Sequence, residues 1–222
     1  MKSKFLFFVF AFLIIANTSN AQVSDIDGHQ YKTVKIGKQV WMAENLNVSH
    51  FRNGDIIPES KDWVTSEDGK PAWCYNNNDI TNGKKYGKLY NWNAAKDPRG
   101  LAPKGWHIPT VADWKILTKY LGGENVAGGK LKSTYGWVNK GYYRSVNNGN
   151  GINESGFAAL PGGSRDFDLE FGGIGELGFW WSASANNTGY GWFCILEFEN
   201  SKITMDSTPY ARNGYSVRCV KD

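Results

Sequence analysis

Three acidic residues stand at alternate positions in a glycine-rich segment: Asp166, Asp168 and Glu170. On an extended chain alternate side chains point to the same face, and carboxylate oxygens are the ligands that Ca²⁺ prefers in proteins. Counted from Asp166, however, the sixth and twelfth positions hold Phe171 and Leu177, where an EF-hand loop has Gly and Glu. The segment therefore predicts either an irregular calcium site on these three carboxylates or a solvated loop in a protein without a cofactor.

The glycines that follow, in GGIGELG at 172–178, resemble a phosphate-binding loop only by composition. A Walker loop needs Gly-Lys-Ser/Thr at the start of a helix, and a dinucleotide loop needs a strand before it and a helix after it. Here the next residues are FWWSAS at 179–184, which is a β-type sequence. We therefore expect no phosphate binding at these glycines, which more simply supply positive φ angles in an ordered loop.

The remaining reactive residues fit no catalytic or zinc motif. The histidines, His29, His50 and His107, are far apart, and no His-Glu-x-x-His, Cys-x-x-Cys or Gly-x-Ser-x-Gly pattern occurs. We expect His107, in GWHIPT, to be a packed core residue, and we predict no catalytic residue. An enzyme acting on extracellular polysaccharide is the alternative, because glycosidases need only a pair of carboxylates. The acids available for such a pair include Glu154, Asp166, Asp168, Glu170, Glu176 and Glu197.

Aromatic residues make up 15% of the chain, with 10 Trp, 11 Tyr and 12 Phe. Several of the later ones stand among Asn, Gly, Asp and Arg, where exposed rings stack on ligands and short polar groups form hydrogen bonds. Each ring is also compatible with a place in the core, since aromatic side chains are readily buried. We predict a face that binds an extracellular protein or a glycan through Tyr190, Trp192, Asp206, Tyr210 and Arg212.

The first 21 residues have the organisation of a secretory signal peptide. Lys2 and Lys4 precede the apolar run Phe5–Ala16, and Ser19 and Ala21 are the small residues of a cleavage site. The apolar run is too short to span a bilayer, and no later segment is apolar enough to do so. We expect a secreted or cell-surface protein.

The mature part, residues 22–222, has the length of a single domain. The whole chain has 25 Lys and Arg against 21 Asp and Glu, and two of the lysines belong to the signal peptide. Domains that bind nucleic acid carry a strongly basic face. Nucleic acid is therefore not an expected partner of this nearly neutral domain.

Three cysteines, Cys74, Cys194 and Cys219, would meet an oxidising environment outside the cell. Cys194 and Cys219 lie in predicted strands near the C-terminus, and we predict a disulfide between them, with Cys74 as a buried thiol. Because connectivity cannot be read from sequence, three reduced and buried cysteines are the alternative.

A short series of predicted elements positions these residues. Alternation of apolar and polar residues around Ile36-Gly37-Lys38 predicts a β-hairpin. Apolar spacing predicts a helix over 88–96 and a second over 111–121, whose start is marked by the capping pair Thr110 and Asp113. An antiparallel sheet follows, so the predicted fold class is α+β.

The segments around these helices predict loops and strands. We predict a loop over residues 47–85 with one strand at AWCYN. The later strands are expected at GFAALPGG, FWWSASA, GYGWFCILEFENSKITMDS (two strands joined at ENSK) and GYSVRCVKD. Trp180 and Trp181 are neighbours on one of these strands, so their rings point to opposite faces. One ring belongs in the core, and the other is free to face outward.

Segments in this order, among them DIDGHQYKTVKIGKQVWMAENLN, YGKLYNWNAA, SGFAALPGGSR, WWSAS and NGYSVRCVKD, resemble the Fibrobacter succinogenes major paralogous domain family. The resemblance covers about residues 25–222. It implies a bacterial protein of the secreted or surface type, often from Bacteroidetes. It also implies a loop-rich C-type-lectin-like fold, distantly similar to formylglycine-generating enzymes, in which two helices flank a twisted antiparallel sheet and the chain ends meet.

The resemblance also bears on chemistry. Formylglycine-generating enzymes carry a close pair of active-site cysteines near the C-terminus, whereas Cys194 and Cys219 are far apart in this sequence. The Glu-Pro-Asn and Trp-Asn-Asp motifs of calcium-dependent lectins are absent as well. The resemblance therefore supports neither that redox site nor classical calcium-dependent sugar binding. From the aromatic and Asn-rich loops we predict a non-catalytic binding module, with a structural cell-surface protein as a further alternative.

Overall fold

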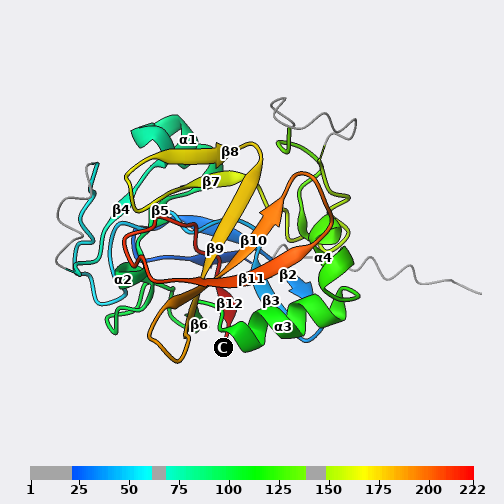
Figure 1. Ribbon diagram of the computed structural model, residues 1–222. Helices are drawn as coiled ribbons and strands as arrows, with labels where there is room; N and C mark the ends of the chain where they lie inside the picture. Colours follow the sequence, from blue (N-terminus) through cyan, green and yellow to red (C-terminus); the bar gives the residue numbers. More distant parts are fainter. Residues whose placement is uncertain (1–21, 62–68, 139–148) are drawn as a thin grey trace, which may run out of the picture.

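The computed structural model describes residues 22–61, 69–138 and 149–222 (Figure 1). The predicted signal peptide, residues 1–21, lies outside the described residues. Within the described part, no helix has both the length and the apolar character needed to cross a bilayer. The described chain is mostly β-structure with a few helices, which confirms the predicted α+β class.

The first of two five-stranded sheets brings the two ends of the described chain together. Its order is β1-β2-β3-β12-β6, and all neighbouring strands are antiparallel. The strands are β1 (Gln22–Ser24), β2 (Gln30–Ile36), β3 (Gln39–Met42), β6 (Trp106–His107) and β12 (Val220–Lys221). The hairpin β2–β3 confirms the predicted one, and Figure 1 shows the red strand β12 close to the blue strands that open the chain.

The second sheet carries most of the C-terminal half in the order β11-β10-β9-β7-β8. Its strands are β7 (Gly162–Arg165), β8 (Phe171–Ile174), β9 (Leu177–Ala185), β10 (Gly191–Glu197) and β11 (Ile203–Thr208). Only β7 and β9 run parallel, through Gly163 and Gly178. A small third sheet pairs β4 (Trp73–Cys74) with β5 (Leu89–Tyr90).

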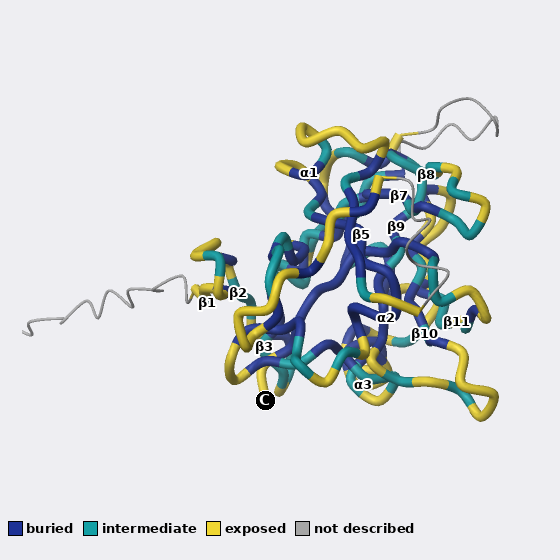
Figure 2. The backbone as a smooth tube through the Cα atoms, turned by 90° about the vertical axis from the view of Figure 1, so that its left-hand side faces the viewer, coloured by how far each residue is buried: buried dark blue, intermediate teal, exposed yellow. Residues whose placement is uncertain are grey.

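The helices lie outside these sheets. They are a 3-10 turn η2 (Asn76–Asn78), α1 (Ile80–Tyr86), α2 (Trp92–Ala95), α3 (Val111–Tyr120) and α4 (Glu124–Leu131). Helix α3 confirms the predicted helix, and Thr110 and Asp113 form the expected capping box at its start. Figures 1 and 2 show α1 and α3 at opposite ends of the molecule.

Three local predictions are wrong. Leu89 and Tyr90 were expected to be helical, but they form β5 against β4, and only the short α2 follows. Helix α1 lies in a segment predicted as loop, and the Asp79 side chain caps it by accepting from the Thr81 N–H (2.8 Å). The strand predicted at GFAALPGG begins only at Gly162.

His107 is not the packed core residue that the sequence predicts, because its strand β6 is at the edge of the first sheet. Its side chain is 39% exposed. The Nδ1 atom lies 2.8 Å from the carboxylate of Asp222, and Nε2 lies 3.2 Å from the carboxylate of Asp113. The ring therefore links the C-terminal residue to the capped start of α3.

Strand β9 lies between two hydrophobic cores and separates them. Both Trp180 and Trp181 are fully buried, so the expectation that one ring is free to face outward is wrong. Around Trp180 lie other large buried rings, those of Trp41, Trp114, Trp137 and Phe157. Around Trp181 lie Tyr90, Trp92, Phe193 and Tyr215. Figure 2 shows buried residues through the middle of the molecule and exposed ones mainly in the connections.

The predicted disulfide between Cys194 and Cys219 is not formed. All three cysteines are free and buried, as the alternative prediction has it. Cys194 belongs to the core around Trp180 and Cys219 to the core around Trp181, so the two thiols lie in cores that strand β9 separates. Desolvation raises the pKa of all three thiols, that of Cys74 to about 12.

We predict that Gly178→Ala lowers the free energy of unfolding by about 1–3 kcal/mol, the usual cost of overpacking a core. A Cβ atom on Gly178 would stand 2.7 Å from Cζ3 of the buried Trp180 ring. Gly172→Ala is the matched control, since a Cβ there would meet nothing within 4 Å. Unfolding in urea measures both variants, and equal changes would contradict the packing around β9.

Candidate functional site

The acidic segment forms the turn between β7 and β8. Asp166 Oδ1 accepts hydrogen bonds from the N–H groups of Asp168 (3.0 Å) and Glu170 (3.1 Å). Within the described ranges, no group of three or more His, Cys, Asp or Glu side chains is placed to hold a metal ion. The structure thus does not gather the three carboxylates as a calcium site requires, and Asp166 instead shapes the turn.

Two of the predicted ligand-binding residues lie near this turn. The ring of Tyr210 stacks on that of Phe167, with the ring centres 4.0 Å apart and the planes at 16°. Tyr210 is 43% exposed, and Asp206 is exposed on the edge strand β11. Desolvation, together with the nearby charges of Asp166 and Asp206, raises the pKa of the buried Tyr215 hydroxyl to about 12, although its hydrogen bond with Asn213 acts in the opposite direction. We call Phe167, Tyr210, Asp166 and Asp206 the Tyr210 face.

The loop that carries Tyr210 contains a buried amide with an unpaired acceptor. The Asn213 N–H donates to the Tyr210 carbonyl (3.0 Å), and its Nδ2 donates to the hydroxyls of Tyr215 (2.9 Å) and Thr208 (3.3 Å). Asn213 is 5% exposed, and its Oδ1 has no partner among the described residues. A buried acceptor without a partner costs about 1–3 kcal/mol.

Trp192 is not part of the Tyr210 face. Along β10 and β11, Trp192 is paired with Ser207, whereas Phe193 is paired with Asp206. Because alternate residues of a strand point to opposite faces, the Trp192 ring and the Asp206 carboxylate lie on opposite sides of the sheet. Trp192 instead lines an open hollow of about 350 Å³ with residues 185–188.

The two other predicted residues lie in loops at the same end of the sheet. Tyr190 is 41% exposed and ends the β9–β10 connection, next to Gly191, which pairs with Thr208. Arg212 is half-buried in the loop that follows β11. The sequence prediction missed Phe167, whose only signal was a ring among acids in a predicted loop.

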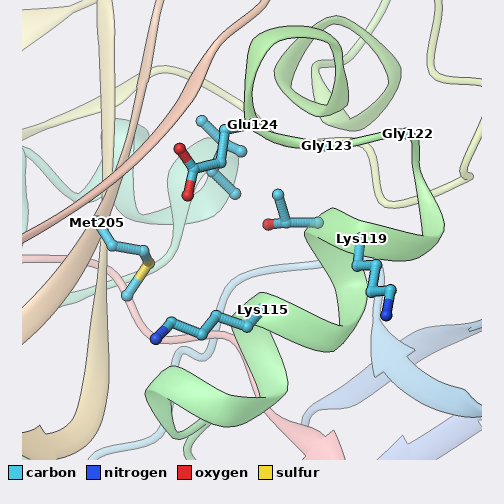
Figure 3. Close-up of a pocket in the computed structure, with 8 residues that line it drawn as sticks. Lys115, Lys119, Gly122, Gly123, Glu124 and Met205 are labelled. Atoms are coloured by element: carbon cyan, nitrogen blue, oxygen red, sulfur yellow. The ribbon is translucent and has the colours of Figure 1, made fainter.

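A further hollow, of about 480 Å³, lies between α3, the start of α4 and β11. Figure 3 shows the side chains of Lys115, Glu124 and Met205 extending around it, while Lys119 points away. The hollow has an apolar side formed by Ile203 and Met205, and no aromatic residue lines it. It therefore lacks the flat ring that distinguishes the Tyr210 face.

The turn geometry predicts different outcomes for two neighbouring acids. Asp166→Ala removes the acceptor of two backbone N–H groups and should lower the free energy of unfolding by about 1 kcal/mol. Asp168→Ala removes an exposed carboxylate and should change the free energy of unfolding by less than about 0.5 kcal/mol.

Thermal unfolding of the wild type in EDTA and in added Ca²⁺ should give the same midpoint. A midpoint raised by Ca²⁺ in the wild type but not in Asp168→Ala would contradict the assignment of this segment as a turn without a calcium site.

The comparison with known families agrees with the resemblance seen in the sequence. The family model described as Fibrobacter succinogenes major domain matches residues 34–221. No curated protein and no solved structure matches the chain. Because the match covers most of its length, the chain belongs to the Fibrobacter succinogenes major domain family.

Proposed function

We propose that this protein is a secreted, non-catalytic binding module with a C-type-lectin-like fold, whose ligand is an extracellular glycan. The exposed stack of Tyr210 on Phe167 is the observation that carries the proposal. The C-type-lectin-like assignment is supported by the pairing of β12 with β3 and β6, which joins the chain ends, and by helices outside the sheets.

The Tyr210 face suits a sugar ring for two physical reasons. A ring already held against Phe167 is restrained before a ligand arrives, so binding costs less conformational entropy. An aromatic face packs against the apolar C–H groups of a sugar, while short polar side chains accept its hydroxyl protons. Asp206 is exposed, its charge acts on Tyr215 together with that of Asp166 from the β7–β8 turn, and its carboxylate supplies such an acceptor. An extracellular protein segment is the other ligand class that the test must distinguish.

The test is a glycan array followed by calorimetric titration of the best oligosaccharide. Tyr210→Ala and Phe167→Ala should each weaken binding about tenfold, because the stacked surface is lost. Asp206→Asn should weaken it less, since an amide oxygen still accepts a hydrogen bond.

Two aromatic residues outside the Tyr210 face, the exposed Tyr120 and the half-buried Trp192, serve as controls. Tyr120, 64% exposed on α3, lies outside the Tyr210 face, and Trp192 lies on the opposite side of the second sheet. Tyr120→Ala and Trp192→Ala should leave the affinity unchanged. A loss as large in either control as in Tyr210→Ala would refute the proposed face, and capture of proteins without any glycan would assign it to a protein ligand.

A further inference from the structure

A guanidinium group is buried in the structure, and no carboxylate of the described residues is bonded to it. Arg218 is 1% exposed. Its Nε and Nη2 atoms donate to Asn45 Oδ1 at 3.0 and 2.7 Å, and Nη1 donates to the carbonyl of Phe157. The guanidinium also lies 4.2 Å from the centre of the Phe157 ring. All of these partners are neutral.

The bonding capacity of Arg218 is not filled by these contacts. A guanidinium has five N–H donors, and the three bonds leave one N–H on each terminal nitrogen without an acceptor among the described residues. The buried Lys132 differs, since its ammonium donates to three carbonyls, those of Glu197, Phe198 and Asn200. A buried charge is costly unless it is paired. An anion bonded to the Arg218 guanidinium would therefore reduce the free-energy cost of burying its charge.

Arg218 lines a cavity of about 570 Å³ that a small molecule could enter. Asn45 lines it too, as do Gly156 and Ala158 on either side of the carbonyl that Arg218 bonds. The contacts of the guanidinium therefore lie at the wall of this cavity. Its other walls come from β2, the segment after β3, the end of α1 and residue 135.

The charges around this cavity favour an anion. Lys32, Lys84 and Lys85 line it together with Arg218, and all three lysines are exposed. Among the described residues that line it, Glu44 is the only acidic one. Although desolvation lowers the pKa of Arg218 to about 9, the group is still charged at pH 7.

We propose that this cavity binds a small anionic ligand through an oxyanion, a carboxylate or a phosphate, that bonds the two spare N–H groups of Arg218. Paired N–H groups on a planar guanidinium match two oxygens of such a group. Tyr31, Tyr86 and Tyr135 line the same cavity and supply apolar surface for the rest of the ligand. The site is separate from the Tyr210 face, with which it shares no residue.

Glu44 gives the proposal a sharp test. Its Oε2 accepts the Lys32 N–H (2.8 Å), and its charge acts on Arg218. A carboxylate in this position attracts Arg218 but repels an incoming anion. Glu44→Gln removes the charge and keeps the hydrogen-bond acceptor, and Glu44 is exposed, so we expect the variant to fold.

The experiment titrates acetate and inorganic phosphate into the purified protein by calorimetry at pH 7 and fixed ionic strength. We expect saturable binding of at least one of them, and Glu44→Gln should tighten it about fivefold by removing one repulsive unit charge. Glu199→Gln makes the same change in net charge at an exposed residue that does not line the cavity, and should leave the affinity unchanged. The stronger of the two probes distinguishes a carboxylate ligand from a phosphate ligand.

Absence of saturable binding to the wild type and to Glu44→Gln would overturn the proposal. An equal gain in affinity in the two glutamine variants would also overturn it, because it would show binding by net charge alone.

Arg218→Lys keeps a charge but loses the paired donors, and should abolish the gain in affinity given by Glu44→Gln. If Arg218→Lys does not fold, the two glutamine variants decide. Tyr210→Ala should leave oxyanion binding unchanged, so failure of the glycan proposal would not affect this result.

Discussion

The side-chain amide of Asn45 is the interaction on which the rest of the structure depends. Its Oδ1 accepts from the indole N–H of Trp180 (2.9 Å) and from two nitrogens of Arg218, while its Nδ2 donates to the Tyr86 carbonyl (2.8 Å) and the Ser216 hydroxyl (3.3 Å). One buried amide thus joins the segment after β3, strand β9, helix α1 and the C-terminal segment. Because buried polar groups must be paired, these four segments are fixed relative to one another.

Strand β9 transmits this constraint to the surface. With Trp180 in one core and Trp181 in the other, β9 cannot rotate or shift by one residue without exchanging two large rings between cores. Strands β10 and β11 pair onto it in sequence, so the loop after β11 leaves the sheet at a fixed place. The stack of Tyr210 on Phe167 then closes that loop against the β7–β8 turn. The Tyr210 face is therefore carried by two loops and the edge strand β11, and the two cores fix its position.

The two proposed sites differ in how they relate to folding. Apart from Asp206 on β11, the Tyr210 face lies on loops, where side chains are free to be selected for a ligand with little effect on the cores. Arg218, in contrast, is part of the framework through Asn45, and its charge is costly in the interior. A ligand that pairs with Arg218 would stabilise the same framework, so binding at the cavity and stability of the fold are linked.

Local chemistry was readable from the sequence alone. The capping pair of α3 and the β2–β3 hairpin follow from residue types at short spacing, because those interactions join neighbours along the chain. The α+β class follows from the order of the predicted elements, and the family follows from the ordered segments along the chain. Three features needed partners distant in sequence: the burial of both rings on β9, the free state of Cys194 and Cys219, and the separation of Trp192 from Asp206. The tertiary structure alone decided them, since the first two depend on which segments pack on the two faces of the sheet and the third depends on the register in which β10 pairs with β11.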